Sequence, residues 1–124
     1  DVLLPLLSKE QLQHDMLANA GIVRCKEGLE TLLTKLPPLN FRPDLSAMSS
    51  QQIELIFMHI TASLITHAAL TRTESRGAHI RQEYEQKDKR WEKQWIVFQQ
   101  GLMNVRNHLY EHNQIKKYAH AIFQ

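Results

Sequence analysis

Cysteine and glycine are scarce in this 124-residue chain, and each shortage excludes a class of chemistry. A single cysteine, Cys25, cannot form an internal disulfide and is typical of a reducing compartment. The four glycines, Gly21, Gly28, Gly77 and Gly101, stand far apart, so none belongs to a glycine-rich loop that binds phosphate groups. The formal net charge of +2 is too small for an electrostatic nucleic-acid surface, so we expect no nucleic-acid partner.

Charged side chains are also missing between Leu55 and Thr71. This stretch is short for a membrane span and is interrupted by histidine, serine and threonine, so we interpret it as protein core and expect no membrane span. The apolar N-terminus lacks the basic region of a secretory signal. Because the chain begins at Asp1 and not at a methionine, we expect it to be an excised piece of a longer protein.

Three helices are predicted from apolar residues at helical spacing, near 9–20, 26–36 and 50–75. Brief links join them, which favours antiparallel neighbours. We therefore predict an all-α fold: an antiparallel three-helix bundle, spectrin-repeat-like, over residues 8–80 of a single domain that covers 1–124.

Capping patterns set the expected ends of these helices. Ser8 with Gln11, and Ser49 with Gln52, form the capping-box pattern at the start of the first and third helices. Gly77 is expected to end the third, because glycine readily adopts the left-handed conformation that follows many helices.

The long third helix carries two adjoining apolar stripes. One consists of Ile53, Ile56, Phe57, Ile60, Leu64 and Ala68, and the other of Leu55, Met58, Ala62, Ile65 and Ala69. A single stripe indicates a helix that lies on a core, whereas two adjoining stripes indicate a helix covered from two sides. We expect the long helix to be covered in this way.

The C-terminal part, residues 81–124, shows weaker patterns. Residues 81–93 mix charges of both signs and are interpreted as a solvated segment. The run 94–98 is strand-like and 99–101 resembles a turn, while apolar spacing predicts a final helix within 103–123. We therefore expect an irregular or partly helical tail.

Seven histidines and one cysteine raise the question of metal binding or catalysis. His108 and His112 are four residues apart, as in some metal sites, but the ligand count that such a site needs favours surface histidines. His59 and His67 are expected at the edge of the core, with hydrogen-bond partners. Cys25 has no evident base beside it, so we expect neither a metal site nor a catalytic residue.

A charged cluster follows the long helix and offers the best candidate site. Its members are Arg72, Glu74, Ser75, Arg76, His79 and Arg81. Such residues can simply complement the helix dipole and solvate the helix end. Alternatively, they lie at a seam with another domain, where arginine can bind carboxylates or carbonyls bidentately. Arg72 and Arg76 are expected to share a helix face, with Glu74 on a different side.

Two runs in the chain resemble a known family. The run from Thr71 to Arg81, TRTESRGAHIR, is similar to a segment near the C-terminus of the succinate dehydrogenase, fumarate reductase and L-aspartate oxidase flavoproteins. The run from Met16 to Arg24, MLANAGIVR, followed by Glu27-Gly28-Leu29, resembles the start of the same C-terminal helical domain. The resemblance covers roughly residues 9 to 98 and favours the second reading of the cluster.

Within the family, the residues favour L-aspartate oxidase. The segment Gly21 to Arg24 looks more like the oxidase than the dehydrogenases. The dehydrogenase pattern continues through an acidic-Pro-basic-acidic segment to Trp and then His-Thr. Here the segment Glu83 to Glu85 lacks the proline, and Trp91 is followed by Gln94-Trp95.

The resemblance implies a parent enzyme that oxidises L-aspartate to iminoaspartate with non-covalent FAD in the cytoplasm, for quinolinate and NAD biosynthesis. It places the flavin and the catalytic residues in the FAD-binding and capping domains, which would precede this chain. The cluster would dock against those domains, and replacing Arg76 with alanine should leave the isolated chain stable. The alternatives are a fumarate reductase or succinate dehydrogenase C-terminal domain, or a non-catalytic helical interaction module.

Overall fold

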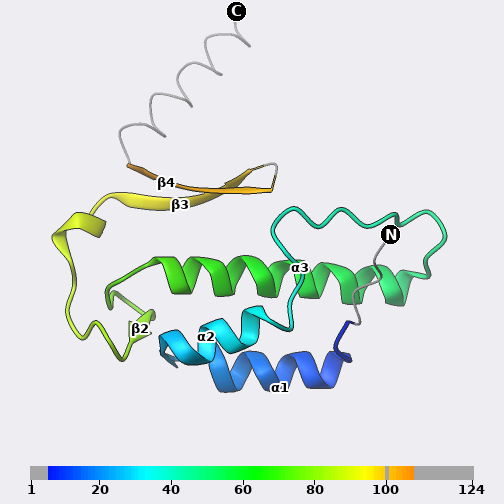
Figure 1. The fold of residues 1–124 in the computed structure, drawn as a ribbon, viewed down its shortest axis with the longest axis horizontal. Coiled ribbons are helices and arrows are strands. Elements are labelled where there is room, and N and C mark those ends of the chain that lie inside the picture. The colour runs from blue at the N-terminus through cyan, green and yellow to red at the C-terminus, as the bar shows by residue number, and fades with distance from the viewer. Residues whose placement is uncertain (1–5, 100, 108–124) are drawn as a thin grey trace, which may run out of the picture.

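The computed structural model describes residues 6–99 and 101–107. Within them, three helices are arranged with four short strands and one 3-10 turn. The helices are α1 (Lys9–Asn19), α2 (Lys26–Leu33) and α3 (Ser50–Thr71), and the turn is η1 (Lys89–Trp91). The strands are β1 (Val23–Arg24), β2 (Ile80–Arg81), β3 (Gln94–Gln99) and β4 (Leu102–Asn107). The long helix α3 lies between the α1–α2 pair and the β3–β4 hairpin (Figure 1).

The prediction of an all-α three-helix bundle is wrong, because the chain folds as α+β. β1 pairs in parallel with β2, with Val23 opposite Ile80, and this ladder joins segments far apart in the sequence. β3 and β4 form an antiparallel hairpin in which Gln94 lies opposite Asn107. The final helix expected within 103–123 is contradicted up to residue 107, where β4 runs. The rest of that prediction, together with His108 and His112, lies outside the described residues.

The hairpin contacts both α3 and the loop that precedes it. Met103 Sδ lies 3.3 Å from the Thr71 hydroxyl at the C-terminal end of α3. Gly101 has a φ of +76°, and a Cβ at that position would lie 3.1 Å from the Cα of Asn40. Only glycine meets both conditions, so Gly101 lets the hairpin turn approach this loop closely.

Local capping signals correctly predicted where the helices begin. The Ser8 hydroxyl accepts a hydrogen bond from the Gln11 amide, and Ser49 and Gln52 exchange both bonds of a capping box. Cys25 caps α2, since its sulfur accepts a hydrogen bond from the Gly28 amide. The helix ends were predicted less well: α2 stops at Leu33 and not at 36, and α3 stops at Thr71 and not at 75.

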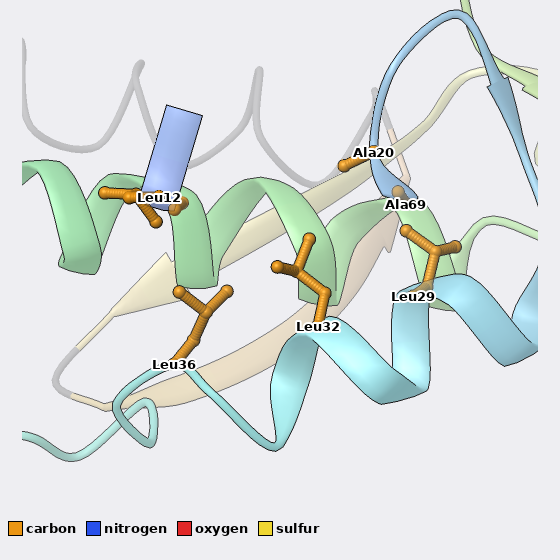
Figure 2. Close-up of a cluster of buried hydrophobic side chains, with 7 residues drawn as sticks. Leu12, Ala20, Leu29, Leu32, Leu36 and Ala69 are labelled. Carbon is orange, nitrogen blue, oxygen red and sulfur yellow. The ribbon is translucent and has the colours of Figure 1, made fainter. Parts of the chain in front are cut away.

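The core lies where α1 and α2 pack on one side of α3. Leu29, Leu32 and Leu36 point from α2 and the turn after it toward α3, and Leu12 joins them from α1 (Figure 2). Ala62 and Ala69 provide small contacts on α3. Burial of these apolar side chains is the main stabilising term for the packing of the three helices.

Polar side chains of α3 are buried together with this core. The fully buried His59 accepts a hydrogen bond from the Leu7 amide at Nε2, and its Nδ1 lies 2.8 Å from the Leu55 carbonyl oxygen. Ser63 donates to the Pro37 carbonyl oxygen, and Thr66 to that of Ala62. The prediction that His59 has hydrogen-bond partners is confirmed, but His59 lies inside the core and not at its edge.

α3 has the length and hydropathy of a membrane-spanning helix. Its most apolar 18-residue window has a mean hydropathy of 1.5, and 33% of that window is buried.

α3 was predicted to be covered from two sides, and α1 and α2 cover one of them. On another side, Phe57 and Ile65 remain 53% and 42% exposed, so an apolar face of the helix is open within the described part of the chain.

Candidate functional site

The charged cluster occupies the turn that carries the chain from α3 into β2. The prediction that Gly77 ends α3 is wrong, because α3 ends at Thr71. Gly77 instead sits in a tight turn with φ +59°, between Arg76 and His79, which exchange backbone hydrogen bonds. The helix has already ended, with Arg72 in extended conformation. Residues 72–81 therefore form a compact turn, and several of its charged side chains bind one another or nearby backbone groups.

Glu74 lies at the centre of this turn and is fully buried. Its Oε2 accepts hydrogen bonds from Arg72 Nε and Arg76 Nε, each at 2.8 Å. Its Oε1 accepts from Arg76 Nη2 at 3.0 Å and from the Asp88 amide at 2.8 Å. We call Arg72, Glu74, Arg76 and Asp88 the Glu74 cluster. It ties the end of α3 to the segment that leads into η1.

The same contacts set the charge state of Glu74. Burial raises the pKa of its carboxyl group, but hydrogen bonds from Arg76, the Asp88 amide and Arg72 outweigh burial and lower the pKa from 4.5 to about 2. The carboxylate is therefore ionised at neutral pH, and Arg72 is further held by its stacking on the Trp91 ring, 5.2 Å from the centroid. The cluster is a closed electrostatic unit and not a pair of solvated arginines.

Arg81 forms a second unit beside it and is only 2% exposed. Its Nη1 donates to the carbonyl oxygens of Ala69 and Leu70 at 3.0 and 2.9 Å, and its Nη2 donates to Glu83 Oε1 at 2.8 Å. Helix-terminal carbonyls lack partners within the helix, so this guanidinium supplies the cap of α3. We call Arg81, Glu83 and these two carbonyls the Arg81 cap.

Glu83 extends the Arg81 cap to α2. Its Oε1 also accepts a hydrogen bond from the Lys26 amide at 2.6 Å, at the first residue of that helix. A carboxylate at a helix N-terminus is stabilised by the helix dipole. Ser75 holds the turn from within, because its hydroxyl accepts from the Arg81 amide and donates to the Tyr84 carbonyl. Together these contacts join α2, α3 and the strand pair.

His79 connects the turn to β1. Its Nε2 lies 3.0 Å from the Arg72 carbonyl oxygen, and its Nδ1 lies 3.0 Å from Arg24 Nη1. A carbonyl can only accept and a guanidinium can only donate, so His79 is neutral, with its proton on Nε2. Burial lowers the pKa of His79, and the nearby positive charges of Arg24, Arg81 and Arg72 lower it further.

Acid is therefore expected to loosen this contact. The pKa of His79 in the folded chain lies below its ordinary value of 6.5, so its stabilising effect is complete above pH 6.5 and is lost as the pH falls below that value. We expect the melting temperature to drop between pH 7.5 and pH 5.5. His67, whose pKa burial also lowers, adds to the drop in the same direction.

Replacing His79 with glutamine should reduce the drop, because the amide can donate to the Arg72 carbonyl and accept from Arg24 without titrating. The matched control is the exposed His14 changed to glutamine, which should leave the drop as it is. Equal pH profiles for the His79→Gln variant and the parent would show that His79 does not titrate in this window.

The structure brings all six predicted site residues into one turn, but it arranges them differently from the prediction. Glu74 was expected on a different side from Arg72 and Arg76, yet it binds both. The arginines were expected to be solvated in the isolated chain. Arg76 is instead held by Glu74 with its side chain 33% exposed, and Arg81 is buried. Their contact with another domain stays a prediction.

Sequence reasoning missed four residues that complete the site: Arg24, Glu83, Asp88 and Trp91. Three of the four make contacts that span 19 or more residues: Arg24 with His79, Glu83 with the Lys26 amide, and the Trp91 carbonyl with Arg72. Arg24 could have been found from the sequence, because the run from Met16 to Arg24 resembles the same family as the run from Thr71 to Arg81. Nothing local marks Glu83 or Asp88 among the mixed charges of residues 81–93.

The described residues do not fit a flavin. The guanidinium groups of the cluster, which could bind phosphate, are engaged by Glu74, Glu83, His79 or backbone carbonyls. The two described hollows, of about 630 and 280 Å³, have largely apolar linings and contain no glycine. Among the described residues no group of three His, Cys, Asp or Glu side chains is placed to hold a metal ion. The arrangement can fasten and dock structural elements.

Comparison with known proteins agrees with the two sequence runs. The family model described as fumarate reductase flavoprotein C-terminus matches residues 9–121. One component of the fumarate reductase (CoM/CoB) of Methanothermobacter marburgensis is 34% identical over 103 residues, which cover 75% of this chain and 19% of that protein. No solved structure matches the chain at a significant level.

L-aspartate oxidases are similarly close. The enzyme of Bacillus subtilis is 33% identical over 94 residues, covering 75% of this chain and 18% of its own length. The enzyme of Rhodospirillum rubrum is 38% identical over 74 residues, which cover 60% of this chain and 24% of that enzyme. The chain thus spans about a fifth of the length of the curated relatives it matches. It belongs to the succinate dehydrogenase and fumarate reductase flavoprotein family, as a C-terminal domain close to that of L-aspartate oxidase.

Proposed function

We propose that this chain is the C-terminal domain of an FAD-dependent L-aspartate oxidase and has a structural and docking role. The observation that carries the proposal is the Gly21–Arg24 run, which resembles the oxidase and whose Arg24 contacts His79 of the second matching run. Two L-aspartate oxidases among the relatives support it. The parent enzyme would oxidise L-aspartate to iminoaspartate in the cytoplasm and supply quinolinate for NAD biosynthesis.

This domain contributes no catalytic residue in the proposal. FAD supplies the two-electron oxidation when it is bound to the part of the protein that precedes this chain. The Glu74 cluster and the Arg81 cap hold α2, α3 and the strand pair as one body. We propose that Arg72, Glu74, Ser75, Arg76, His79 and Arg81 also lie at the contact with the FAD-binding and capping domains. The exposed Gly77 and Ala78 at the tip of the turn are suited to such a contact.

A fumarate reductase or succinate dehydrogenase flavoprotein is the second candidate. The relative from Methanothermobacter marburgensis, named a fumarate reductase, is as similar as the oxidases and supports it equally. The two candidates share the domain and differ in substrate, which is bound elsewhere in the protein. Substrate preference of the full-length protein therefore distinguishes them.

We expect the full-length protein, loaded with FAD, to oxidise L-aspartate in preference to succinate. For each of the two substrates, peroxide release is measured in the presence of oxygen, and fumarate-dependent turnover is measured in its absence. The 124-residue chain alone is the control and should neither bind flavin nor turn over. Succinate oxidation without aspartate oxidation would move the assignment to the dehydrogenase branch, and stable flavin binding by the chain alone would contradict the division of roles.

A further inference from the structure

A groove lies between α1 and the N-terminal two-thirds of α3 in the described part of the chain. It has a volume of about 630 Å³. Leu12 and Met16 line it from α1, and Ile53, Phe57, Met58 and Ile65 line it from α3. Glu54 is the only charged residue of its lining. The groove is thus an apolar channel with one acidic residue.

The groove coincides with the open side of α3. Phe57 and Ile65 remain 53% and 42% exposed there, and Phe57 also borders the smaller hollow of about 280 Å³ under the loop before α3. The two hollows therefore meet at Phe57. The two-stripe pattern of α3 is typical of a helix covered from two sides. α1 and α2 cover one side, and the β3–β4 hairpin and the loop before α3 contact the helix elsewhere, yet Phe57 and Ile65 remain exposed. Large exposed apolar patches of this kind mark interaction surfaces.

We propose that this groove receives the flavin-bearing part of the same polypeptide, which covers Phe57 and Ile65. The family model describes a C-terminal region, and the chain spans about a fifth of the length of its relatives, so most of such a protein precedes it. The chain also enters beside the groove. The Leu7 amide bonds to His59 of α3, and Ser8 then starts α1, whose Leu12 lines the groove.

Two other occupants fit the surface less well. A symmetric dimer would bring the same patch of both copies together, and a concave groove does not complement itself. A membrane surface favours lysine and arginine beside the apolar face, whereas the groove lining contains Glu54 and no basic residue. A covering domain of the same polypeptide needs neither feature. The proposal rests on the proposed domain role but not on aspartate as the substrate.

Thiol labelling in the full-length flavoprotein tests the proposal. Thr61 lines the groove and Thr31 lies on α2 away from it, and both are exposed in the described structure. Each is changed to cysteine in a Cys25→Ser background, since serine can keep the N-cap of α2. Peptide mass spectrometry then follows maleimide labelling at each new thiol. We expect Thr61→Cys to react about tenfold or more slowly than Thr31→Cys, because a covered thiol is less accessible.

Equal labelling rates would show an open groove and overturn the proposal. Protection of Thr61→Cys that disappears on dilution would assign the groove to a second copy, and protection only with lipid vesicles would assign it to a membrane, and each result overturns it too. The substrate assay is independent of these labelling rates. Aspartate oxidation can therefore fail while the groove is protected, and aspartate can be oxidised while the groove is open.

A charge placed in the groove gives a second, independent readout. Ile65→Lys should raise the rate of limited proteolysis between the domains of the full-length protein by about tenfold, because a lysine covered by a partner loses its hydration. The matched control is Ile22→Lys, at an isoleucine that is 75% exposed outside the groove, and its rate should stay close to that of the parent. No change for Ile65→Lys would contradict the proposed contact.

Discussion

Replacing Arg81 with methionine is expected to lower the free energy of unfolding of the chain by about 3–5 kcal/mol, as measured by urea denaturation. Methionine has a similar reach but no donors. The change would leave the Ala69 and Leu70 carbonyls and the Glu83 carboxylate without the guanidinium that binds all three. Because Arg81 is only 2% exposed, water cannot readily take its place.

Arg81→Lys should recover only part of the loss. A lysine ammonium is a compact donor and cannot span two carbonyls and a carboxylate as the planar guanidinium does. The matched control is Arg90→Met, which removes another arginine paired with an acid two residues away, Asp88. The side chain of Arg90 is 85% exposed, so its loss should have little effect. An equally small effect for Arg81→Met would show that the C-terminal end of α3 does not depend on Arg81.

The cap by Arg81 also explains why sequence reasoning misplaced the end of α3. Helix starts were predicted correctly because Ser8 and Ser49 interact with residues three positions away, within reach of a local pattern. The end of α3 is set by a side chain ten or more residues further along, which binds the last carbonyls after the chain has reversed. Gly77 resembled a helix stop, but it serves the turn that makes this reversal possible.

The missed strands have a similar physical origin. β1 and β2 are two residues each and gain their partners from segments about 57 residues apart, so no local alternation marks them. The strand β3 was recognised as strand-like, but Leu102 and Val105 of its partner also fit helical spacing. Short amphipathic runs permit both readings, and the pairing with β3 decides between them. The candidate site was found through family resemblance, whereas its internal contacts depend on the fold.

Replacing Glu74 with glutamine is expected to lower the free energy of unfolding by about 3 kcal/mol at neutral pH. The amide keeps the shape of the side chain but loses its charge, and its NH₂ group faces donors from Arg76, Arg72 or the Asp88 amide. The same contacts lower the pKa from 4.5 to about 2, which corresponds to an effect on the order of 3 kcal/mol, because each pKa unit corresponds to about 1.4 kcal/mol.

The pH dependence provides a test that a purely steric effect would not pass. The folded-state pKa of Glu74 is depressed, so its contribution is complete above pH 4.5 and is lost as the pH falls toward 2. The parent should therefore lose stability over this range, and Glu74→Gln should lose less, so that the two denaturation curves converge in acid. Glu85→Gln, at an exposed glutamate of the same segment, is the control and should follow the parent. A Glu74→Gln curve that stays parallel to the parent down to pH 2 would mean that its defect does not arise from the buried charge bound by Arg72 and Arg76.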